Sequence, residues 1–309
     1  MAKRSKKGRD ITGIVIIDKP TGLSSNHVLQ RVKRLFNANK AGHTGSLDPL
    51  ATGVLPVCLG EATKLSTYLL DADKQYQVRC QLGILTDSGD SDGDVIAQQN
   101  IPDYSEEKLQ RILQDFTGEL QQIPPMFSAL KHQGQPLYKL ARQGIEIERK
   151  SRLITIYSIE LLACDADSFT LQVSCSKGTY IRTLVQDIAA ALGSCGHVTM
   201  LRRTDAAGYD LTQALSLERL QDLAEQQGLP GLDSQLLPAH EALPDWPEVR
   251  LDADMSADMR FGRSVTTEFQ GHCAKVRLFD VQDQFIGLGE LAQDGTVSAK
   301  RLFVTGDTV

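Results

Sequence analysis

Apolar residues recur with helical spacing in three long stretches of the chain. The first follows Ser24 and Ser25, either of which can cap a helix, and the others span 105–118 and 182–193. Each of the last two ends at a glycine, as many helices do. The apolar positions are Val28, Val32, Leu35 and Phe36, then Leu109, Ile112, Leu113 and Phe116, then Leu184, Val185, Ile188 and Leu192. The pattern predicts three helices, each with one buried face.

Strand patterns separate and follow these helices. A short apolar run predicts a buried strand at 14–17, and alternation predicts strands at 76–82, 153–162, 169–175, 274–281, 285–291 and 297–304. Shorter helices are expected at 63–70 and 136–142, and a helical appendage with a proline-bearing linker at 205–247. The last three strands, joined by short turns, indicate a small antiparallel barrel. The fold class is therefore α+β.

Charge is distributed unevenly along the chain. The net charge is −6, which argues against a nucleic-acid partner at first sight. However, residues 205–260 alone contribute −9 with twelve acidic residues and three arginines, so the remainder is basic. The basic residues gather at Lys131, Lys139, Arg142, Arg149, Lys150, Arg152, Lys177, Arg182, Arg202 and Arg203. This asymmetry favours a polyanionic partner that avoids the acidic stretch.

Composition excludes several functional classes. The chain is 41% hydrophobic and 23% charged, as in ordinary globular proteins, and 309 residues suffice for about two domains. Its six cysteines form no C-x-x-C pair, which argues against a zinc knuckle or a dithiol redox site and indicates a reducing cytosol. The apolar run after the basic start breaks at Asp18, too early for a signal peptide or a membrane span. Residues 1–10 are expected to form a mobile basic arm.

The stretch 42–53 carries the strongest sign of chemistry. It reads G-H-T-G-S-L-D-P-L-A-T-G, with three glycines and an aspartate fixed against a proline. Pro49 restricts Asp48 to extended or turn conformations, so the carboxylate has few positions to occupy. The glycines leave room for a bulky planar group. From spacing alone, an ordinary Asx turn remains the competing interpretation.

Three segments together resemble one known family. The stretch 42–53, continued by V-L-P at 54–56 and G-E-A-T-K at 60–64, resembles the catalytic motif of the TruB-type tRNA pseudouridine synthases. The K-P and S-S pairs within 19–25 resemble that family's K-P-x-G-x-S-S motif, and 176–182 resembles its S-K-G-T-Y-I-R motif. Phe127 replaces the family's usual tyrosine.

The resemblance implies an architecture. It implies a pseudouridine synthase catalytic domain at 11–247, with a mixed, mainly antiparallel sheet flanked by helices and a thumb insert at about 123–152. A small PUA-like RNA-binding β-barrel would follow at 248–309. The helical appendage at 205–247 would belong to the catalytic domain.

The resemblance also assigns candidate site residues. Asp48 would be the nucleophile, Tyr76 the active-site tyrosine that stacks on the base and serves as a possible proton acceptor, and Arg182 the partner that keeps Asp48 ionised. An arginine in a first helical turn opposes the helix dipole by roughly 0.3–1 kcal/mol, which an ion pair would offset. Residues expected to contact RNA are His43, Tyr180, Leu201, Lys19, Lys64, Lys131, Arg142 and Lys177.

The implied reaction is the isomerisation of uridine 55 in the T loop of tRNA to pseudouridine, after the base is flipped out of its stack. No cofactor or metal is implied, because nothing is transferred from a second substrate. The expected partner is the T stem-loop of tRNA. The protein is expected to be a cytoplasmic monomer that needs no obligate protein partner and does not associate with a membrane.

Two other functions deserve comparison. One is a tRNA-binding or remodelling protein, an RNA chaperone without catalysis; the intact Asp48, Tyr76 and Arg182 argue against it. The other is a glycoside- or nucleoside-cleaving enzyme, which needs a second carboxylate, and the motifs offer only Glu61. The acidic run 86–94, which is similar to the family's T-D-x-x-D-x-x-G loop, does not match the EF-hand order, so a solvated turn is expected there.

Overall fold

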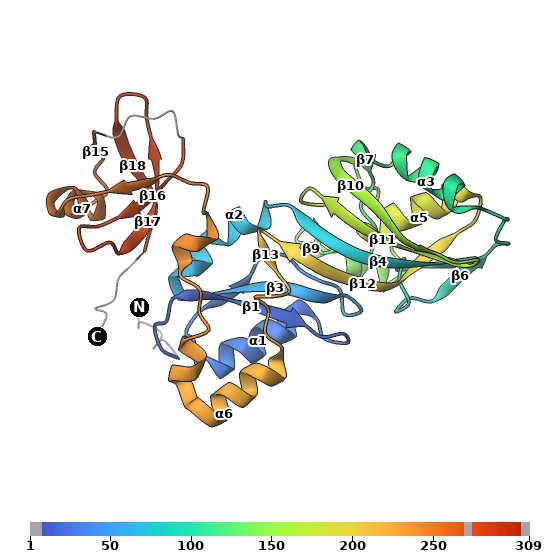
Figure 1. The fold of residues 1–309 in the computed structure, drawn as a ribbon, viewed down its shortest axis with the longest axis horizontal. Helices are drawn as coiled ribbons and strands as arrows, with labels where there is room; N and C mark the ends of the chain where they lie inside the picture. Colours follow the sequence, from blue (N-terminus) through green and yellow to red (C-terminus); the bar gives the residue numbers. More distant parts are fainter. Residues whose placement is uncertain (1–7, 269–273, 304–309) are drawn as a thin grey trace.

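The computed structural model describes residues 8–268 and 274–303, and its centre is a nine-stranded sheet (Figure 1). Along the sheet lie β1 (Gly13–Lys19), β3 (Thr52–Leu59), β12 (Gly196–Ala206), β4 (Lys74–Leu82), β11 (Ser168–Cys175), β10 (Arg152–Cys164) and β7 (Gly118–Gln122). Two short strands, β2 (Ala41–His43) and β13 (Tyr209–Asp210), pair with β3 and β12. Only β12 and β3 pair in parallel among these strands of the described chain, so the predicted mixed, mainly antiparallel sheet is confirmed.

Helices cover the two ends of this sheet separately. The β1–β3 end packs against α1 (Ser25–Leu35) and α6 (Leu217–Asp233), and the β4–β11–β10 end packs against α3 (Glu106–Asp115) and α5 (Ile181–Leu192), as Figure 1 shows. Ser24 and Ser105 cap α1 and α3 through their hydroxyl oxygens, and Gly193 ends α5 with a left-handed conformation. The three helices predicted from apolar spacing are confirmed.

Shorter elements connect these parts. The predicted helix at 63–70 is a 3-10 turn, η1 (Gly60–Leu65), followed by α2 (Ser66–Leu70). Two hairpins are formed by β5 (Ile84–Thr86) with β6 (Val95–Gln98), and by β8 (Lys131–His132) with β9 (Gln135–Pro136), which leads into α4 (Leu137–Ala141). A second 3-10 turn, η2 (Ala239–Ala242), precedes the C-terminal part. Within α6, Gly228 leaves the helical conformation just before Pro230 and kinks the element.

The C-terminal part is a curled, open five-stranded sheet. Its strand order is β14 (Glu248–Arg250), β16 (Val276–Phe279), β17 (Phe285–Leu291), β18 (Thr296–Leu302) and β15 (Val265–Thr266), with α7 (Ala253–Arg260) beside it. The predicted strands are present, although the first is shorter, and β14 pairs in parallel with β16. The strand order agrees with a PUA-like half-barrel and not with a closed barrel.

The C-terminal sheet shares a hydrophobic cluster with the β1 edge of the large sheet. Leu288 on β17 belongs to the same buried cluster as Ile14 and Ile16 on β1, with Phe285 and Phe303 packed against it. Aromatic contacts continue the cluster, because Trp246 packs edge-on against Tyr68 with ring centroids 5.0 Å apart. The two sheets are therefore joined by packing as well as by the chain.

The basic start of the chain differs in part from its expected form. Residues 1–7 lie outside the described residues, but Arg9 is fixed: its guanidinium pairs with Asp233 on α6 and donates to the carbonyl of Phe36 at 2.9 Å. The prediction of a mobile arm is therefore wrong for its end. Among the described residues, no helix is both long enough and apolar enough to span a bilayer.

Candidate functional site

A cavity of about 340 Å³ lies where the two halves of the large sheet meet. Residues from five separate parts of the sequence line it, and they include Asp48, Tyr76, Tyr180, Arg182 and Leu201. The structure thus brings together five of the predicted site residues. Leu201, although largely buried, borders this cavity and is not simply a core residue.

The loop that carries Asp48 is held by side chains of the two preceding elements. The hydroxyl of Ser25, at the start of α1, accepts from the backbone N–H of Leu47 at 2.7 Å and donates to its carbonyl at 3.0 Å. The ammonium of Lys19, at the end of β1, donates to the carbonyls of Pro49 at 3.3 Å and Ala51 at 2.5 Å. Leu47 precedes Asp48, whereas Pro49 and Ala51 follow it, so these bonds together fix the carboxylate's backbone on either side.

Lys19 is therefore not the RNA contact predicted from the motif. Its side chain is 0% exposed, and a buried ammonium cannot reach a phosphate. Burial lowers the pKa of Lys19 to about 8, while the nearby Asp48 carboxylate opposes that shift. The lysine acts instead as an internal clamp on the motif loop.

Arg182 connects three loops that meet at the cavity. It lies in the first turn of α5, where its Nε is 3.1 Å from Asp48 Oδ2 and its Nη1 is 3.5 Å from Asp90 Oδ2. It also donates to the carbonyls of Ser88 and of Phe127, the latter at 2.6 Å. The expected pair with Asp48 is present. The tyrosine hydroxyl that Phe127 lacks is not needed for this contact, because the backbone carbonyl makes it.

Asp90 is a site residue that sequence reasoning missed. The run 86–94 was expected to be a solvated turn, but Asp90 is only 4% exposed and Ser88 is also buried. The Asp90 carboxylate accepts from the Ser88 hydroxyl at 2.6 Å and from the backbone N–H of Asp92 at 3.1 Å, in addition to facing Arg182. The similarity of this acidic run to the family's T-D-x-x-D-x-x-G loop was the available signal.

The carboxyl of Asp48 has a raised pKa, contrary to the expectation from its arginine. Burial is the largest cause, the Arg182 guanidinium opposes it, and the Asp90 carboxylate adds to it. The side chain keeps 43% of its surface accessible because it faces the cavity, yet protein atoms crowd it on the other sides. Arg182 orients Asp48 and offsets only part of the free-energy cost of burying its negative charge.

Two tyrosines line the same cavity as this carboxylate. Tyr76 lies on β4, directly opposite Arg203 of β12 in the strand register, and burial raises the pKa of its phenol. Tyr180 precedes α5, where its backbone N–H donates to Gln122 Oε1 at 2.8 Å and its carbonyl accepts from Gln122 Nε2 at 3.1 Å. Burial also raises the pKa of the Tyr180 phenol. Both aromatic rings are available to face a flat ligand in the cavity.

The other predicted RNA contacts lie away from the cavity lining. His43 is half-buried at the end of β2, where burial lowers the pKa of its imidazole. Lys64 pairs with Glu61 and donates to the carbonyl of Leu302 at 2.5 Å, so it links η1 to the C-terminal sheet. Its predicted RNA contact would require that link to open.

Three further basic residues that were predicted to contact RNA are exposed. Lys131 lies on the β8–β9 hairpin, Arg142 follows α4 with its guanidinium 5.7 Å from the Tyr138 ring centroid, and Lys177 is 3.0 Å from Asp71. Exposed pairs of this kind contribute little to stability and exchange readily for other anions. Their exposure leaves the three cations accessible to a polyanion.

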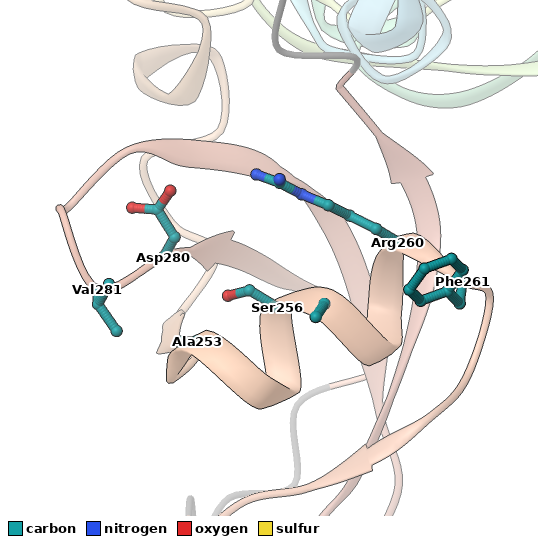
Figure 2. Close-up of a pocket in the computed structure, with 7 residues that line it drawn as sticks. Ala253, Ser256, Arg260, Phe261, Asp280 and Val281 are labelled. Atoms are coloured by element: carbon teal, nitrogen blue, oxygen red, sulfur yellow. The ribbon is translucent and has the colours of Figure 1, made fainter.

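A second hollow, of about 410 Å³, lies in the C-terminal part. Figure 2 shows it between α7 and the turn after β16, with Ser256, Arg260, Phe261, Asp280 and Val281 around it. It contains none of the predicted site residues and no pairing of acid with base like that of Asp48 and Arg182. The candidate active site is therefore the cavity at the large sheet.

Comparisons with known proteins cover the whole of this arrangement. Residues 33–181 match the family described as "TruB family pseudouridylate synthase (N terminal domain)", 182–244 match "tRNA pseudouridylate synthase B C-terminal domain", and 247–303 match "Pseudouridine synthase II TruB, C-terminal". A tRNA pseudouridine synthase B of Nitrosococcus oceani is 49% identical over 300 residues, covering 97% of each chain. One of Shewanella sp. (strain ANA-3) is 50% identical over 314 residues, covering 99% of this chain and 98% of the relative.

A solved structure has the same fold. The protein in "Crystal Structure of a Cbf5-Nop10-Gar1 Complex" superposes with a TM-score of 0.72 at 26% identity, over 94% of this chain and 85% of that one.

Proposed function

The chain belongs to the TruB family of pseudouridylate synthases, and we propose that it isomerises uridine 55 in the T loop of tRNA to pseudouridine. The observation that carries this proposal is the position of Asp48: a carboxylate paired with Arg182, in a cavity that two tyrosines also line. A flipped uracil needs a flat space with aromatic faces, and stacking of this kind is worth about 1–3 kcal/mol per base.

The reaction exchanges one bond between sugar and base for another. The C1′–N1 bond breaks, the uracil turns, and a C1′–C5 bond forms; C5 loses a proton and N1 gains one. A carboxylate beside the base serves this exchange by attacking the ring or the sugar carbon, or by stabilising positive charge on the sugar. In each case Asp48 must be ionised, and Arg182 supports that state.

Substrate contacts are proposed on either side of the cavity. Tyr76, Tyr180 and Leu201 would enclose the flipped uracil, since all three line the cavity. His43, on the same loop as Asp48, would take the space that the base leaves in the RNA. The exposed residues Lys131, Arg142 and Lys177 would contact phosphates.

The arrangement argues against the nucleoside-cleaving alternative. That chemistry requires a second carboxylate free to act as acid or base. Asp90 is the nearest candidate, but its carboxylate is buried and engaged by Ser88 and Arg182. Glu61 is paired with Lys64 on η1, which does not line the cavity.

The domain limits and setting follow from the same proposal. We assign the catalytic domain to 11–247, with a thumb at about 123–152 that closes over RNA, and the PUA-like domain to 248–309. A tRNA substrate and scattered cysteines support a cytoplasmic enzyme, which we propose acts as a monomer without an obligate protein partner.

The test uses tRNA tritiated at C5 of uridine in single-turnover reactions. Asp48→Asn should slow tritium release by roughly 10³-fold or more while leaving tRNA affinity nearly unchanged, because only the reacting group is altered. Asp94→Asn, which changes an exposed acid on the neighbouring loop, is the matched control and should react like the wild type. Tritium release by Asp48→Asn at nearly the wild-type rate would overturn the assignment. Release of free uracil by the wild type would favour cleavage, and tRNA binding without turnover would favour a chaperone.

A further inference from the structure

Strand β12 carries two adjacent arginines with opposite surroundings. Arg202 is partly exposed and forms a two-point ion pair with Asp18, at 3.0 and 2.7 Å. Arg203 is 1% exposed, and among residues 8–268 and 274–303 no carboxylate lies within ion-pair distance of it. A buried guanidinium without a counter-ion is costly, so its retention needs an explanation.

The hydrogen bonds of Arg203 explain where its guanidinium is held. Its Nε donates to the carbonyl of Val54 at 2.7 Å, and its Nη2 donates to the carbonyl of Gly45 at 3.1 Å. These bonds connect both ends of the Asp48 loop to β12. They satisfy donors, but neutral carbonyls do not balance the positive charge.

The partner that remains is Tyr76. The two residues are directly opposed across the antiparallel β12–β4 pair, and both line the cavity beside Asp48. The guanidinium interacts with the phenol and partly counteracts the effect of burial, which raises the pKa of Tyr76. A cation in this position stabilises a phenolate more than a neutral phenol.

We propose that Arg203 is a positioning residue that stabilises the phenolate of Tyr76, so that Tyr76 can take the proton from C5 of the isomerised uracil. This rests on the proposed function. The C5–H bond breaks and its electron pair re-forms the C5–C6 double bond, while the pair of the C6–N1 double bond moves to N1, which takes a proton from water. The Tyr76 oxygen takes the proton from C5. Arg203 keeps its own proton throughout, and Tyr76 later returns the acquired proton to water.

Other titratable groups surround the pair and determine how it must be measured. They are Asp48 on the motif loop, Lys19 on β1, His43 on β2, Lys74 on β4 and Cys175 on β11. Burial lowers the pKa of both Lys19 and Lys74 to about 8, so a rate profile alone would mix several ionisations. The phenol must therefore be observed directly.

The experiment follows the ring carbon that bears the hydroxyl, by NMR of the full-length protein labelled with ζ-¹³C tyrosine. Tyr76→Phe assigns its signal among the seven tyrosines. Arg203→Met should raise the titration midpoint of Tyr76 and lower kcat by about 10²-fold at pH 7, with KM changed little. Arg202→Met, the adjacent control, should leave the midpoint unchanged. An unchanged Tyr76 midpoint in folded Arg203→Met would overturn the proposal.

A second measurement separates this role from a structural one. Replacing Tyr76 by difluorotyrosine makes the phenol more acidic without moving the strand, and it should restore much of the rate lost in Arg203→Met. If Arg203→Met does not fold, the same analogue is placed in the wild type. There the ionisation that forms the general base, seen in the dependence of the rate on pH, should move to lower pH. A profile that does not follow the acidity of the phenol would overturn the proposal, and because the Asp48→Asn test is independent, the proposed function would still stand.

Discussion

The Asp48 loop, 42–53, and the segment 123–152 border the same cavity but are held differently. Side chains from distant elements take the loop's carbonyls: Arg203 binds that of Gly45, and Lys19 binds those of Pro49 and Ala51. The segment bonds mainly to itself, through the β8–β9 hairpin and backbone contacts such as Tyr138 N–H to the carbonyl of Ser128 at 3.0 Å. Most of its residues are exposed.

This difference separates two requirements of the proposed reaction. The reacting carboxylate must sit within a fraction of an ångström of its target, which favours a loop fixed from outside. A surface that receives folded RNA must adapt to it, which favours a segment with few outside contacts. Arg182 joins the two, since it pairs with Asp48 and donates to the carbonyl of Phe127.

The largest expected loss of stability and activity comes from replacing Gly53 of the Asp48 loop. A Cβ on Gly53, which has a φ of +100°, would lie 2.1 Å from the carbonyl oxygen of Arg203. Gly53→Ala should therefore lower the free energy of unfolding by about 3 kcal/mol or more, measured by urea unfolding, and abolish activity.

The matched control is Gly134→Ala in the segment 123–152. Gly134 has a similar φ of +84°, but no atom lies within 4 Å of the position that a Cβ would take, so only the backbone cost of about 1–2 kcal/mol is expected. Equal destabilisation by both substitutions would show that the loop is no more tightly fitted than the segment.

Lys19→Met tests whether the loop is clamped from within. The carbonyls of Pro49 and Ala51 would lose their ammonium donor, and a small shift of Asp48 should lower kcat by about 10²-fold with tRNA affinity unchanged. Lys131→Met, a lysine of the segment, should show the reverse pattern. Rapid-quench kinetics together with filter binding distinguishes the two. A loss of affinity in Lys19→Met with normal kcat would contradict the clamp.

Charge removal in the segment should have a smaller effect, confined to binding. Lys131→Ala and Arg142→Ala should each weaken tRNA binding a few-fold and flatten the slope of log K against log salt by about 0.7–0.9 per charge. Lys108→Ala, on the exposed side of α3, is the control and should change neither quantity. Unchanged salt slopes in the segment variants would place the RNA elsewhere.

The smallest effect concerns stability and runs opposite to activity. Because the pKa of Asp48 lies above its ordinary 3.8 in the folded protein, its charged form destabilises the fold at neutral pH. Asp48→Asn should therefore raise the free energy of unfolding at pH 7. The gain should disappear as the pH falls below 3.8, where the carboxyl is neutral in both states. Both free energies are measured by urea unfolding. If Asp48→Asn is less stable than the wild type at neutral pH, the ion pair with Arg182 stabilises the fold by more than burial of the Asp48 charge destabilises it.

The sequence predicted what depends on local spacing and on motifs. The apolar faces of α1, α3 and α5 follow from periodicity, and the gathering of Asp48, Tyr76 and Arg182 follows from the family motifs. It could not predict contacts between distant segments. The hydrogen bond from Arg182 to the carbonyl of Ser88 joins residues that are 94 positions apart in the sequence. This contact helps to explain why part of the acidic run 86–94 is buried, although a solvated turn was expected.

The same limit explains the errors over basic residues. A lysine beside a proline looks like a surface residue, and only the fold shows that Lys19 is enclosed by carbonyls. Arg202 and Arg203 are neighbours of identical type, so nothing in the sequence separates the partly exposed ion pair of the first from the buried cation of the second. The parallel pairing of β12 with β3, which brings Arg203 to Gly53, is likewise a product of tertiary structure.

The cluster that contains Ile14, Ile16 and Leu288 has a consequence for dissecting the protein. A chain shortened after residue 247 would lose Leu288 together with the flanking Phe285 and Phe303, leaving apolar side chains of β1 facing water. Such a fragment should aggregate instead of working as a smaller enzyme. A chimera that takes its C-terminal sheet from a relative would therefore need the cluster residues of both β1 and β17 from the same relative.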